Sequence, residues 1–333
     1  MVKRLIAALL GVSVLGGLLV VDIYDYVSRP VPLDGGVLDY EIEPGTPFRE
    51  LAHELYERGV IRQPFYWLVL ARVQGEAGAI KAGEYRIEGP VTPAQLLDQF
   101  VRGKTVQFSL TIPEGWTYRQ LRQALTADPR IRNTLSADED VMARLGHPGM
   151  SAEGWFYPET YHFPKGTTDF EFLRRAFELM WRRLHEEWAG RAKGLPLKTP
   201  YEALILASIV EKETARAGER PLIAAVFLSR LERGMRLQTD PTVIYGMGER
   251  YKGNIRARDL RADTPYNTYV HAGLPPTPIA LPGGAAIHAV LHPASTRALY
   301  FVAKGDGSHH FSKTYEEHRK AVVRYQLGGE ARR

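Results

Sequence analysis

The sequence predicts an α+β protein in three parts: an N-terminal transmembrane helix, a small strand-helix-helix-strand module and a larger mixed α+β domain. Three observations lead to this prediction. The chain opens with a long uncharged stretch, continues with two short strand patterns that enclose two helix patterns, and then alternates amphipathic helix patterns with loop-rich segments. Its 333 residues, of which 44% are hydrophobic, are enough for two folded units.

The opening stretch, LIAALLGVSVLGGLLVV, covers residues 5–21 and lies at the short end of the length that spans a bilayer. Two cations precede it, and two aspartates follow shortly after it. Because cations beside a membrane helix stay on the cytoplasmic side, we expect residues 1–4 in the cytoplasm, a transmembrane anchor over residues 5–25, and the rest of the chain exported. A cleaved signal peptide is the alternative, but no small-x-small cleavage site directly follows the apolar run.

The small module is expected over residues 38–104. The segment LDYEIE has the pattern of a strand, and the helix after it is expected to begin with Thr46 as N-cap and Pro47 at its first position, and to end at Gly59. A second helix, PFYWLVLARVQ, and a second strand, EYRI, follow. The last helix of the module has the same Thr-Pro start, at Thr92.

The larger domain is expected over residues 105–330. A long amphipathic helix is predicted for residues 168–188, where large apolar residues recur at helical spacing and indicate core packing. From residue 235 the chain is rich in proline and loops, and long loops of this kind usually build binding surfaces. A buried strand, ALYFVA, is predicted for residues 298–303, and a final helix for residues 315–327.

Composition excludes two classes of site. The chain has no cysteine, so it forms no disulfide and no thiolate metal site, which does not contradict export because a domain of this size is stable without disulfides. The formal net charge of +5 is spread over helices of mixed sign instead of forming a basic block. We therefore expect no nucleic-acid partner.

The segment ASIVEKET, residues 207–214, raises the question of which of its two glutamates is chemically active. A helix is expected to begin with Thr199 as N-cap and Pro200 next, with Glu202 closing a capping box, and this start sets the register. On a helical wheel the apolar residues then share one face with Glu213. Glu211 lies on the opposite face beside Ala207 and Ser208, where we expect water to solvate it.

Burial of Glu213 on an apolar face has a chemical consequence. Desolvation raises the pKa of a carboxyl group toward neutrality, which is what a general acid needs. The alternative is a glutamate at a helix end that forms an ion pair with an arginine such as Arg220 or Arg230. The pattern of residues alone leaves both possibilities open.

Two other kinds of site are not favoured. Ser208 and Lys212 are four residues apart, whereas the serine and lysine of the penicillin-binding signature are three apart. Several histidines raise the question of a metal, but we find no HExxH-type pair and expect neither a metal nor an organic cofactor. These histidines are His288, His292, His309, His310 and His318.

Six segments together resemble one protein family over nearly the whole chain. They are EGWFYPETY (153–161), ASIVEKET (207–214), RLERGMRLQTDPTVIYGMGERY (230–251), TPYNTYVHAGLPPTPIALPG (264–283), HPA (292–294) and LYFVAKGDGSHHFSKTYEEH (299–318). This combination is similar to the endolytic murein transglycosylases, also called YceG-like or MltG proteins. The resemblance implies a LysM-like module at residues 38–104 and a YceG-like catalytic domain at residues 105–330, located in the periplasm on a single-pass anchor in the cell inner membrane.

The resemblance also implies roles for individual residues. Glu213 matches the catalytic glutamate of the family, the second one in its EKE segment, and this is the glutamate that the helical wheel selects. Other residues match positions expected to line the cleft and bind substrate. These are Gln238, Asp240, Tyr245, Tyr266, Asn267, Tyr269 and His309.

Alternatives remain for several of these side chains. Asp240 either caps the short helix that follows it or stabilises positive charge that develops in a sugar ring. Asn267 either binds an N-acetyl group or satisfies a tight turn. The rings of Tyr245, Tyr266 and Tyr269 either stack on sugars or pack in the core.

The reaction implied by the resemblance is non-hydrolytic cleavage of the β-1,4 bond between N-acetylmuramic acid and N-acetylglucosamine in nascent peptidoglycan strands, with Glu213 as single acid and base and a 1,6-anhydro end as product. Expected partners are glycan strands, peptidoglycan synthases of the penicillin-binding class, and the membrane. Two alternatives are a true glycan hydrolase with Asp240 or Glu159 as second acid, and a non-catalytic scaffold that recruits wall synthases.

Overall fold

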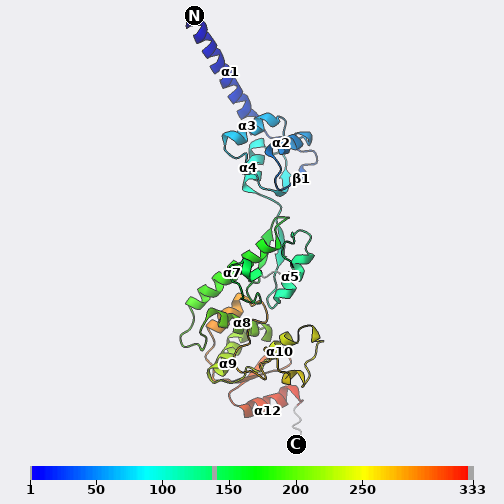
Figure 1. The fold of residues 1–333 in the computed structure, drawn as a ribbon, viewed down its shortest axis with the longest axis vertical. Coiled ribbons are helices and arrows are strands. Elements are labelled where there is room, and N and C mark those ends of the chain that lie inside the picture. Colours follow the sequence, from blue (N-terminus) through cyan, green and yellow to red (C-terminus); the bar gives the residue numbers. More distant parts are fainter. Residues whose placement is uncertain (1, 137–140, 329–333) are drawn as a thin grey trace. The chain divides into compact units, whose positions relative to one another are not determined.

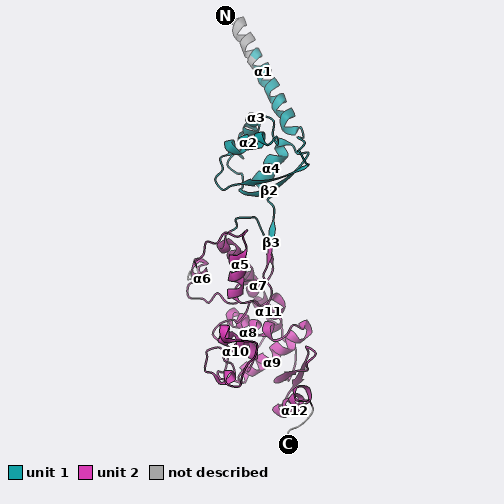
Figure 2. Ribbon diagram, turned by 90° about the vertical axis from the view of Figure 1, so that its right-hand side faces the viewer, with its two compact units in different colours: residues 1–108, 162–167 teal, residues 109–161, 168–333 magenta. Residues whose placement is uncertain are grey.

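The computed structural model describes residues 2–136 and 141–328. The chain divides into two compact units (Figures 1 and 2). Unit 1 comprises residues 1–108 and 162–167, and unit 2 comprises residues 109–161 and 168–333. Each unit combines helices with short antiparallel strands, so the structure is mixed α+β.

The first helix, α1, covers Val2–Ser28. Within the described residues, no helix is long and apolar enough to cross a membrane. This finding contradicts the predicted transmembrane helix at residues 5–25 and the single-pass inner-membrane location that depended on it. The uncharged run of residues 5–21 is shorter than the roughly 20 residues that a span requires.

Unit 1 is built around one antiparallel strand pair. Strand β1 (Val37–Ile42) pairs with β2 (Gly83–Glu88), with Tyr40 opposite Tyr85. Besides α1, three helices contribute to the unit: α2 (Phe48–Glu57), α3 (Pro64–Val73) and α4 (Pro93–Arg102). The order of strand, helix, helix, strand and helix agrees with the sequence pattern.

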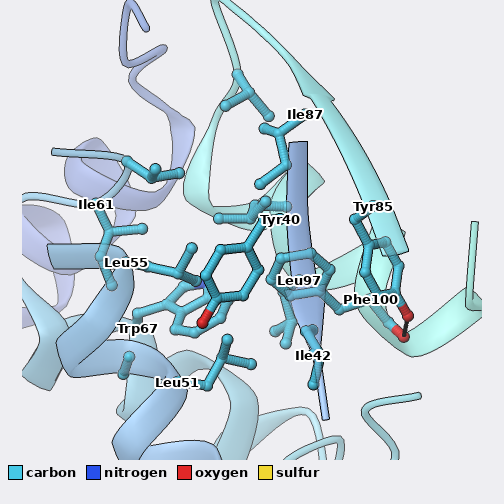
Figure 3. Packing of buried hydrophobic residues seen from close by; sticks show 14 of the residues in the cluster. Tyr40, Ile42, Leu51, Leu55, Ile61, Trp67, Tyr85, Ile87, Leu97 and Phe100 are labelled. Atoms are coloured by element: carbon cyan, nitrogen blue, oxygen red, sulfur yellow. Dashed lines mark hydrogen bonds between the residues drawn. The ribbon is translucent and has the colours of Figure 1, made fainter. Parts of the chain in front are cut away.

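The core of unit 1 is apolar and includes several aromatic rings. Figure 3 shows Leu51 and Leu55 from α2, Trp67 from α3 and Phe100 from α4 pointing toward the strand residues. The indole N–H of Trp67 donates to the carbonyl oxygen of Pro93 at 2.9 Å, so this buried polar group is satisfied. Burial of these rings and of the apolar faces of the helices stabilises the unit.

The predicted helix starts of unit 1 have different outcomes. Thr92 caps α4 as expected, in a reciprocal capping box with Gln95. The prediction for Thr46 is wrong, because Pro47 is the N-cap residue of α2 and no side chain caps that helix. The hydroxyl of Thr46 instead donates to the carbonyl oxygen of Glu43, which stabilises the preceding turn.

The rest of the described chain contributes two further two-stranded sheets and a set of helices. Strands β3 and β4 form one two-stranded sheet, and β5 and β6 form an antiparallel pair with Tyr300 opposite Ser312. The strands are β3 (Phe108–Thr111), β4 (Thr160–Phe163), β5 (Tyr300–Ala303) and β6 (His309–Ser312). The helices are α5 (Tyr118–Ala127), α6 (Val141–Arg144), α7 (Asp169–Ala189), α8 (Pro200–Glu213), α9 (Arg220–Glu232), α10 (Asp240–Met247), α11 (Gly284–Leu291) and α12 (Tyr315–Gln326).

Helix α8 is surrounded by other helices of unit 2. It contacts α7, α9, α10 and α11, and all residues from 203 to 210 are buried. It begins at Pro200 with Thr199 as N-cap, as predicted, and Glu213 is its last residue. Glu213 therefore lies at the end of a helix that is held in place by the packing of residues 203–210 in the core of unit 2.

The prediction that Glu211 is solvated is wrong. Its side chain is only 6% exposed, accepts the backbone N–H of Gly283 at 3.0 Å and lies 3.2 Å from the guanidinium of Arg220. The helical wheel assumes that one face of the helix is exposed to solvent. Helix α8 is packed against other helices around residues 203–210, so its polar face is buried as well. Ser208 on that face is also buried, and its hydroxyl donates to the carbonyl oxygen of Ile205 and accepts the N–H of Ile279.

Replacing Ser208 should reveal this structural role. In Ser208→Ala the buried N–H of Ile279 loses its partner, so we expect the free energy of unfolding to fall by about 1–3 kcal/mol in a denaturant titration. Ser312→Ala is the matched control, because the Ser312 hydroxyl is buried but has no hydrogen-bond partner among the described residues. Equal destabilisation by both substitutions would contradict the role of Ser208.

Candidate active site

A cleft of about 490 Å³ in unit 2 opens beside the end of α8. Its lining comes from the end of α8, the segment before α10, strands β5 and β6, and one side of α12. The lining residues are Glu213, Arg230, Leu237, Gln238, Asp240, Tyr269, Tyr300, Phe301, Val302, Ala303, His309, Tyr315, His318, Val322 and Gln326. Four of the residues predicted to bind substrate thus share one cleft with Glu213: Gln238, Asp240, Tyr269 and His309.

Glu213 is partly buried in the wall of this cleft. Burial raises the pKa of its carboxyl group to about 7, and the nearby charge of Asp240 acts in the same direction. The hydroxyl of Thr239 donates to Oε2 of Glu213 at 2.9 Å, and this bond and the charge of Arg230 oppose the rise. The carboxyl group therefore changes protonation near neutral pH.

No ion pair holds Glu213 in its charged form within the described residues. Arg220 lies instead 3.2 Å from Glu211 and 3.5 Å from Glu114. Arg230 donates to the carbonyl oxygens of Leu237 and Leu299, at 2.6 and 2.7 Å. Both arginines that could have neutralised Glu213 are thus bound elsewhere.

Asp240 is the first residue of α10, and Thr239 before it is the N-cap residue, without a side-chain cap. The hydroxyl of Tyr269 donates to Oδ1 of Asp240 at 2.7 Å. Burial and this bond to Asp240 raise the pKa of the Tyr269 hydroxyl, so the tyrosine remains a donor over the physiological range. The carboxylate of Asp240 is therefore held in the cleft beside Glu213.

Gln238 has a backbone conformation that is rare for its residue type. Its φ angle is +51°, and it is the one non-glycine residue with positive φ in the described part of the chain. Its N–H donates to the carbonyl oxygen of Thr268 at 3.1 Å, which holds the strained backbone in place. Strain of this kind tends to occur at functional sites, where the surrounding contacts maintain it.

His309 lies in the cleft wall at the start of β6. Its Nδ1 is 2.6 Å from Oε2 of Glu219, and its backbone N–H donates to Oε1 of the same carboxylate. Burial disfavours the charge on Glu219, but these bonds from His309 outweigh it and lower the pKa of Glu219. The carboxylate of Glu219 therefore sets the orientation of the His309 ring.

Three predicted binding residues do not line the cleft. The hydroxyl of Tyr245 donates to Glu153, and the hydroxyl of Tyr266 pairs with that of Thr277. Asn267 is buried, and its amide nitrogen donates to the carbonyl oxygens of Asp259, Leu260 and Ala262 while its oxygen accepts the N–H of Tyr269. The amide of Asn267 is thus used by its own loop.

The structure adds three cleft residues from the segment 299–318 that were not predicted to bind substrate. Tyr300, Tyr315 and His318 form an aromatic group on one wall, where the rings of Tyr300 and His318 stack with centroids 5.3 Å apart. Nδ1 of His318 is buried without a hydrogen-bond partner among the described residues, and burial lowers the pKa of this imidazole. Within the sequence these residues look like ordinary strand and helix positions, and only the packing of α12 on β5 brings them together.

A second perturbed carboxyl group, Glu153, lies outside the cleft lining. Burial raises its pKa to about 7. It accepts the N–H of Tyr118 at the start of α5 and the hydroxyl of Tyr245 from α10. Glu153 belongs to the EGWFYPETY segment, and that segment was the signal that could have pointed to it.

A cleft that combines one carboxyl group of near-neutral pKa with aromatic and polar walls is a candidate site for acid–base chemistry on a polar substrate. Comparison with known proteins identifies the family. The chain belongs to the YceG-like family, whose model matches residues 40–324, and the resemblance seen in the six segments is thereby confirmed.

Named relatives are similar over most of this chain. An endolytic murein transglycosylase of Bacillus subtilis is 30% identical over 320 residues, covering 89% of this chain and 87% of that protein. One of Streptococcus pneumoniae is 28% identical and covers 91% of this chain, which spans 61% of that longer relative. A crystal structure of a yceG-like protein from Listeria monocytogenes has a TM-score of 0.55 at 29% identity and covers 86% of this chain and 99% of that one.

The raised pKa of Glu213 predicts a pH-dependent effect on stability. The unfolded chain ionises this group near its ordinary pKa and the folded chain only near 7, so the native state loses stability as the pH rises between these values. Glu213→Gln should therefore raise the free energy of unfolding by up to about 3 kcal/mol at pH 8 and change it little at pH 4.

The measurement is a pair of denaturant titrations at pH 4 and pH 8. Glu178→Gln is the control, because Glu178 is exposed on α7 and forms only a long ion pair with Arg174, at 4.0 Å. A Glu213→Gln protein that is less stable than the wild type at pH 8 would show that the carboxylate is favourably paired in the folded state.

Proposed function

We propose that this chain is a lytic transglycosylase that cleaves the glycan strands of peptidoglycan, with Glu213 as its single acid and base. The names of the Bacillus and Streptococcus relatives support the class of enzyme and the substrate. The observation that carries the catalytic part is the carboxyl group of Glu213, which lies in a cleft wall, has a pKa of about 7 and forms no ion pair within the described residues.

In the first step, protonated Glu213 donates its proton to the glycosidic oxygen between N-acetylmuramic acid and N-acetylglucosamine. The bond from the anomeric carbon to that oxygen breaks, the oxygen leaves as a hydroxyl group, and the muramic acid ring carries positive charge. A pKa near 7 suits this step, because the group is protonated in a large fraction of molecules and still donates readily. Positioned proton transfer contributes on the order of 10² to 10⁴ in rate.

In the second step, the carboxylate of Glu213 accepts the proton of the 6-hydroxyl group of the same muramic acid residue. The oxygen of that hydroxyl attacks the anomeric carbon and closes a 1,6-anhydro ring. Glu213 returns to its protonated form, and no water is consumed. Because the nucleophile belongs to the substrate, the reaction gains from proximity and needs no second protein carboxylate.

The neighbours of Glu213 support both steps in this proposal. The carboxylate of Asp240, held by the hydroxyl of Tyr269, favours the protonated form of Glu213 before the first step and can stabilise the positive charge that develops on the ring. The hydroxyl of Thr239 stabilises the carboxylate between the steps. Tyr300 and Tyr315 offer ring faces on which sugar rings can stack.

The remaining parts of the proposal rest on family resemblance. We propose residues 38–104 as a LysM-like module that holds glycan and residues 105–330 as the catalytic domain. Peptidoglycan synthases of the penicillin-binding class would supply the nascent strands that the enzyme cuts. Co-purification with such a synthase, retained by Glu213→Gln, would support this partnership separately from catalysis.

Product mass tests the reaction. Purified glycan strands digested with the chain should yield ends lighter than reducing ends by one water, and Glu213→Gln should lower the rate by a factor of about 10² to 10⁴. Glu159→Gln is the control, because Glu159 is exposed, accepts the N–H of Thr160 and does not line the cleft. Reducing ends as the only product would identify a hydrolase, and a fully active Glu213→Gln protein would exclude Glu213 as the acid.

The pH profile tests the environment of Glu213. Because the first step needs the protonated acid, kcat/KM should be constant below about pH 7 and fall tenfold per pH unit above it. Thr239→Val removes a bond that lowers the pKa of Glu213, so the falling limb should move to higher pH. Asp240→Asn removes a charge that raises this pKa, so the limb should move to lower pH.

These two variants act as controls for each other, since their shifts have opposite signs. Measurements on glycan of fixed length across pH 5 to 9 provide the comparison. If the fall of kcat/KM occurs at the same pH in both variants as in the wild type, the titration belongs to another group. Glu153 is then the next candidate, because burial raises its pKa to a similar value.

A further inference from the structure

Three potential metal ligands meet on unit 2 outside the cleft. Glu187 lies near the end of α7, His288 is in α11, and His292 directly follows α11. Oε2 of Glu187 is 3.0 Å from Nδ1 of His288 and 3.7 Å from Nε2 of His292, and all three atoms lie within 4.8 Å of one another. No other group of three such ligands occurs within residues 2–136 and 141–328.

The spacing of these atoms fits a zinc-sized ion. Zinc binds imidazole nitrogen and carboxylate oxygen at about 2.0–2.2 Å, so two ligand atoms of one tetrahedral site lie about 3.3–3.5 Å apart. The two distances from Glu187, 3.0 and 3.7 Å, lie on either side of this value. Shifts of a few tenths of an ångström would bring both of these distances to the value for one zinc site.

An ordinary ion pair explains the arrangement less completely. One oxygen of Glu187 faces both imidazoles, and the two rings stack with centroids 4.4 Å apart and an angle of 26° between their planes. One carboxylate oxygen that faces two imidazole nitrogens matches the ligand types of a divalent transition-metal site. A divalent cation between the rings would use the same three atoms.

The ligands are held by elements that already pack together. The N–H of Ala192, just after α7, donates to the carbonyl oxygen of Leu291 in α11 at 2.9 Å. His288 and His292 are four residues apart, and the N–H of His292 donates to the carbonyl oxygen of His288 at 2.8 Å, so both rings project from one side of α11. The site is therefore largely formed before an ion enters.

Exposure allows an ion to reach this group. The side chain of His288 is 59% exposed, while those of Glu187 and His292 are about one-third exposed. Water can thus fill the coordination positions that the protein leaves open. Imidazole and carboxylate ligands suit zinc and related transition metals, whereas magnesium and calcium prefer oxygen ligands alone.

We infer that Glu187, His288 and His292 form a binding site for a divalent transition-metal ion of the zinc class, which links α7 to α11. The sequence predicted no metal because HAVLH lacks the glutamate of an HExxH pair. The same spacing of two histidines is nevertheless present, and the third ligand comes from a helix about a hundred residues earlier in the chain.

The site would stabilise the scaffold of the cleft without taking part in the chemistry. Helix α11 packs against α8, which ends at Glu213. The N–H of Gly283 at the start of α11 donates to Glu211 in α8 at 3.0 Å. An ion that holds α11 to α7 therefore restrains the helix that supports α8.

Calorimetric titration of the tag-free, full-length chain with Zn²⁺ tests this inference. We expect one ion per chain and at least a tenfold weaker affinity in each of His288→Ala, His292→Ala and Glu187→Gln.

His271→Ala is the matched control. His271 pairs with Asp263 at 2.6 Å but is not part of a group of three potential ligands among the described residues. The affinity of the His271→Ala protein for Zn²⁺ should equal that of the wild type.

Two further measurements do not depend on glycan cleavage. Saturating Zn²⁺ should raise the melting temperature of the wild type and of His271→Ala but not of His288→Ala, whose exposed position leaves the fold intact. Co²⁺ should give visible absorption bands that Zn²⁺ displaces. Absence of binding at 100 μM Zn²⁺, or equal binding by the wild type and the three ligand variants, would overturn the site whatever the outcome for catalysis.

Discussion

The structure of unit 2 depends on the burial of α8 on all of its sides. Helices α7, α9, α10 and α11 contact it, and all residues from 203 to 210 are buried. This packing fixes the position of the last turn, so the carboxyl group of Glu213 stays in the cleft wall although the chain leaves the helix directly after it. A catalytic acid must be held in place within a fraction of an ångström, and a fully packed helix does this better than a loop.

Local patterns predicted most elements because helix starts and apolar periodicity are properties of neighbouring residues. The long helix expected at residues 168–188 is α7, and the strand expected at residues 298–303 contains β5. The prediction that water solvates Glu211 was wrong. The sequence pattern of one helix does not show that neighbouring helices cover both of its faces. The transmembrane helix was also wrong, because the prediction rested on an apolar run at the short end of spanning length.

The cleft was predictable only in part. Glu213 stood out because it shares a helix face with apolar residues, and Gln238, Asp240, Tyr269 and His309 come from the recognised segments. Tyr300, Tyr315 and His318 also lie in a recognised segment, 299–318, but their common wall forms only when α12 packs on β5, which the sequence does not show. The same limit applies to the group of Glu187 and two histidines, which joins the ends of two helices.

Burial alone does not decide which carboxyl group does chemistry, because burial raises the pKa of Glu153, Glu211 and Glu213 alike. Glu211 lies against Arg220 and accepts a backbone N–H, so two contacts within the protein partly offset the cost of burying its charge. Glu153 accepts two donors that join α5 to α10, outside the cleft. Glu213 accepts one hydroxyl, that of Thr239, and keeps its remaining capacity for a substrate proton. Among groups of similar burial, the one with unused hydrogen-bonding capacity and access to the cleft is therefore the one suited to move a proton in both directions.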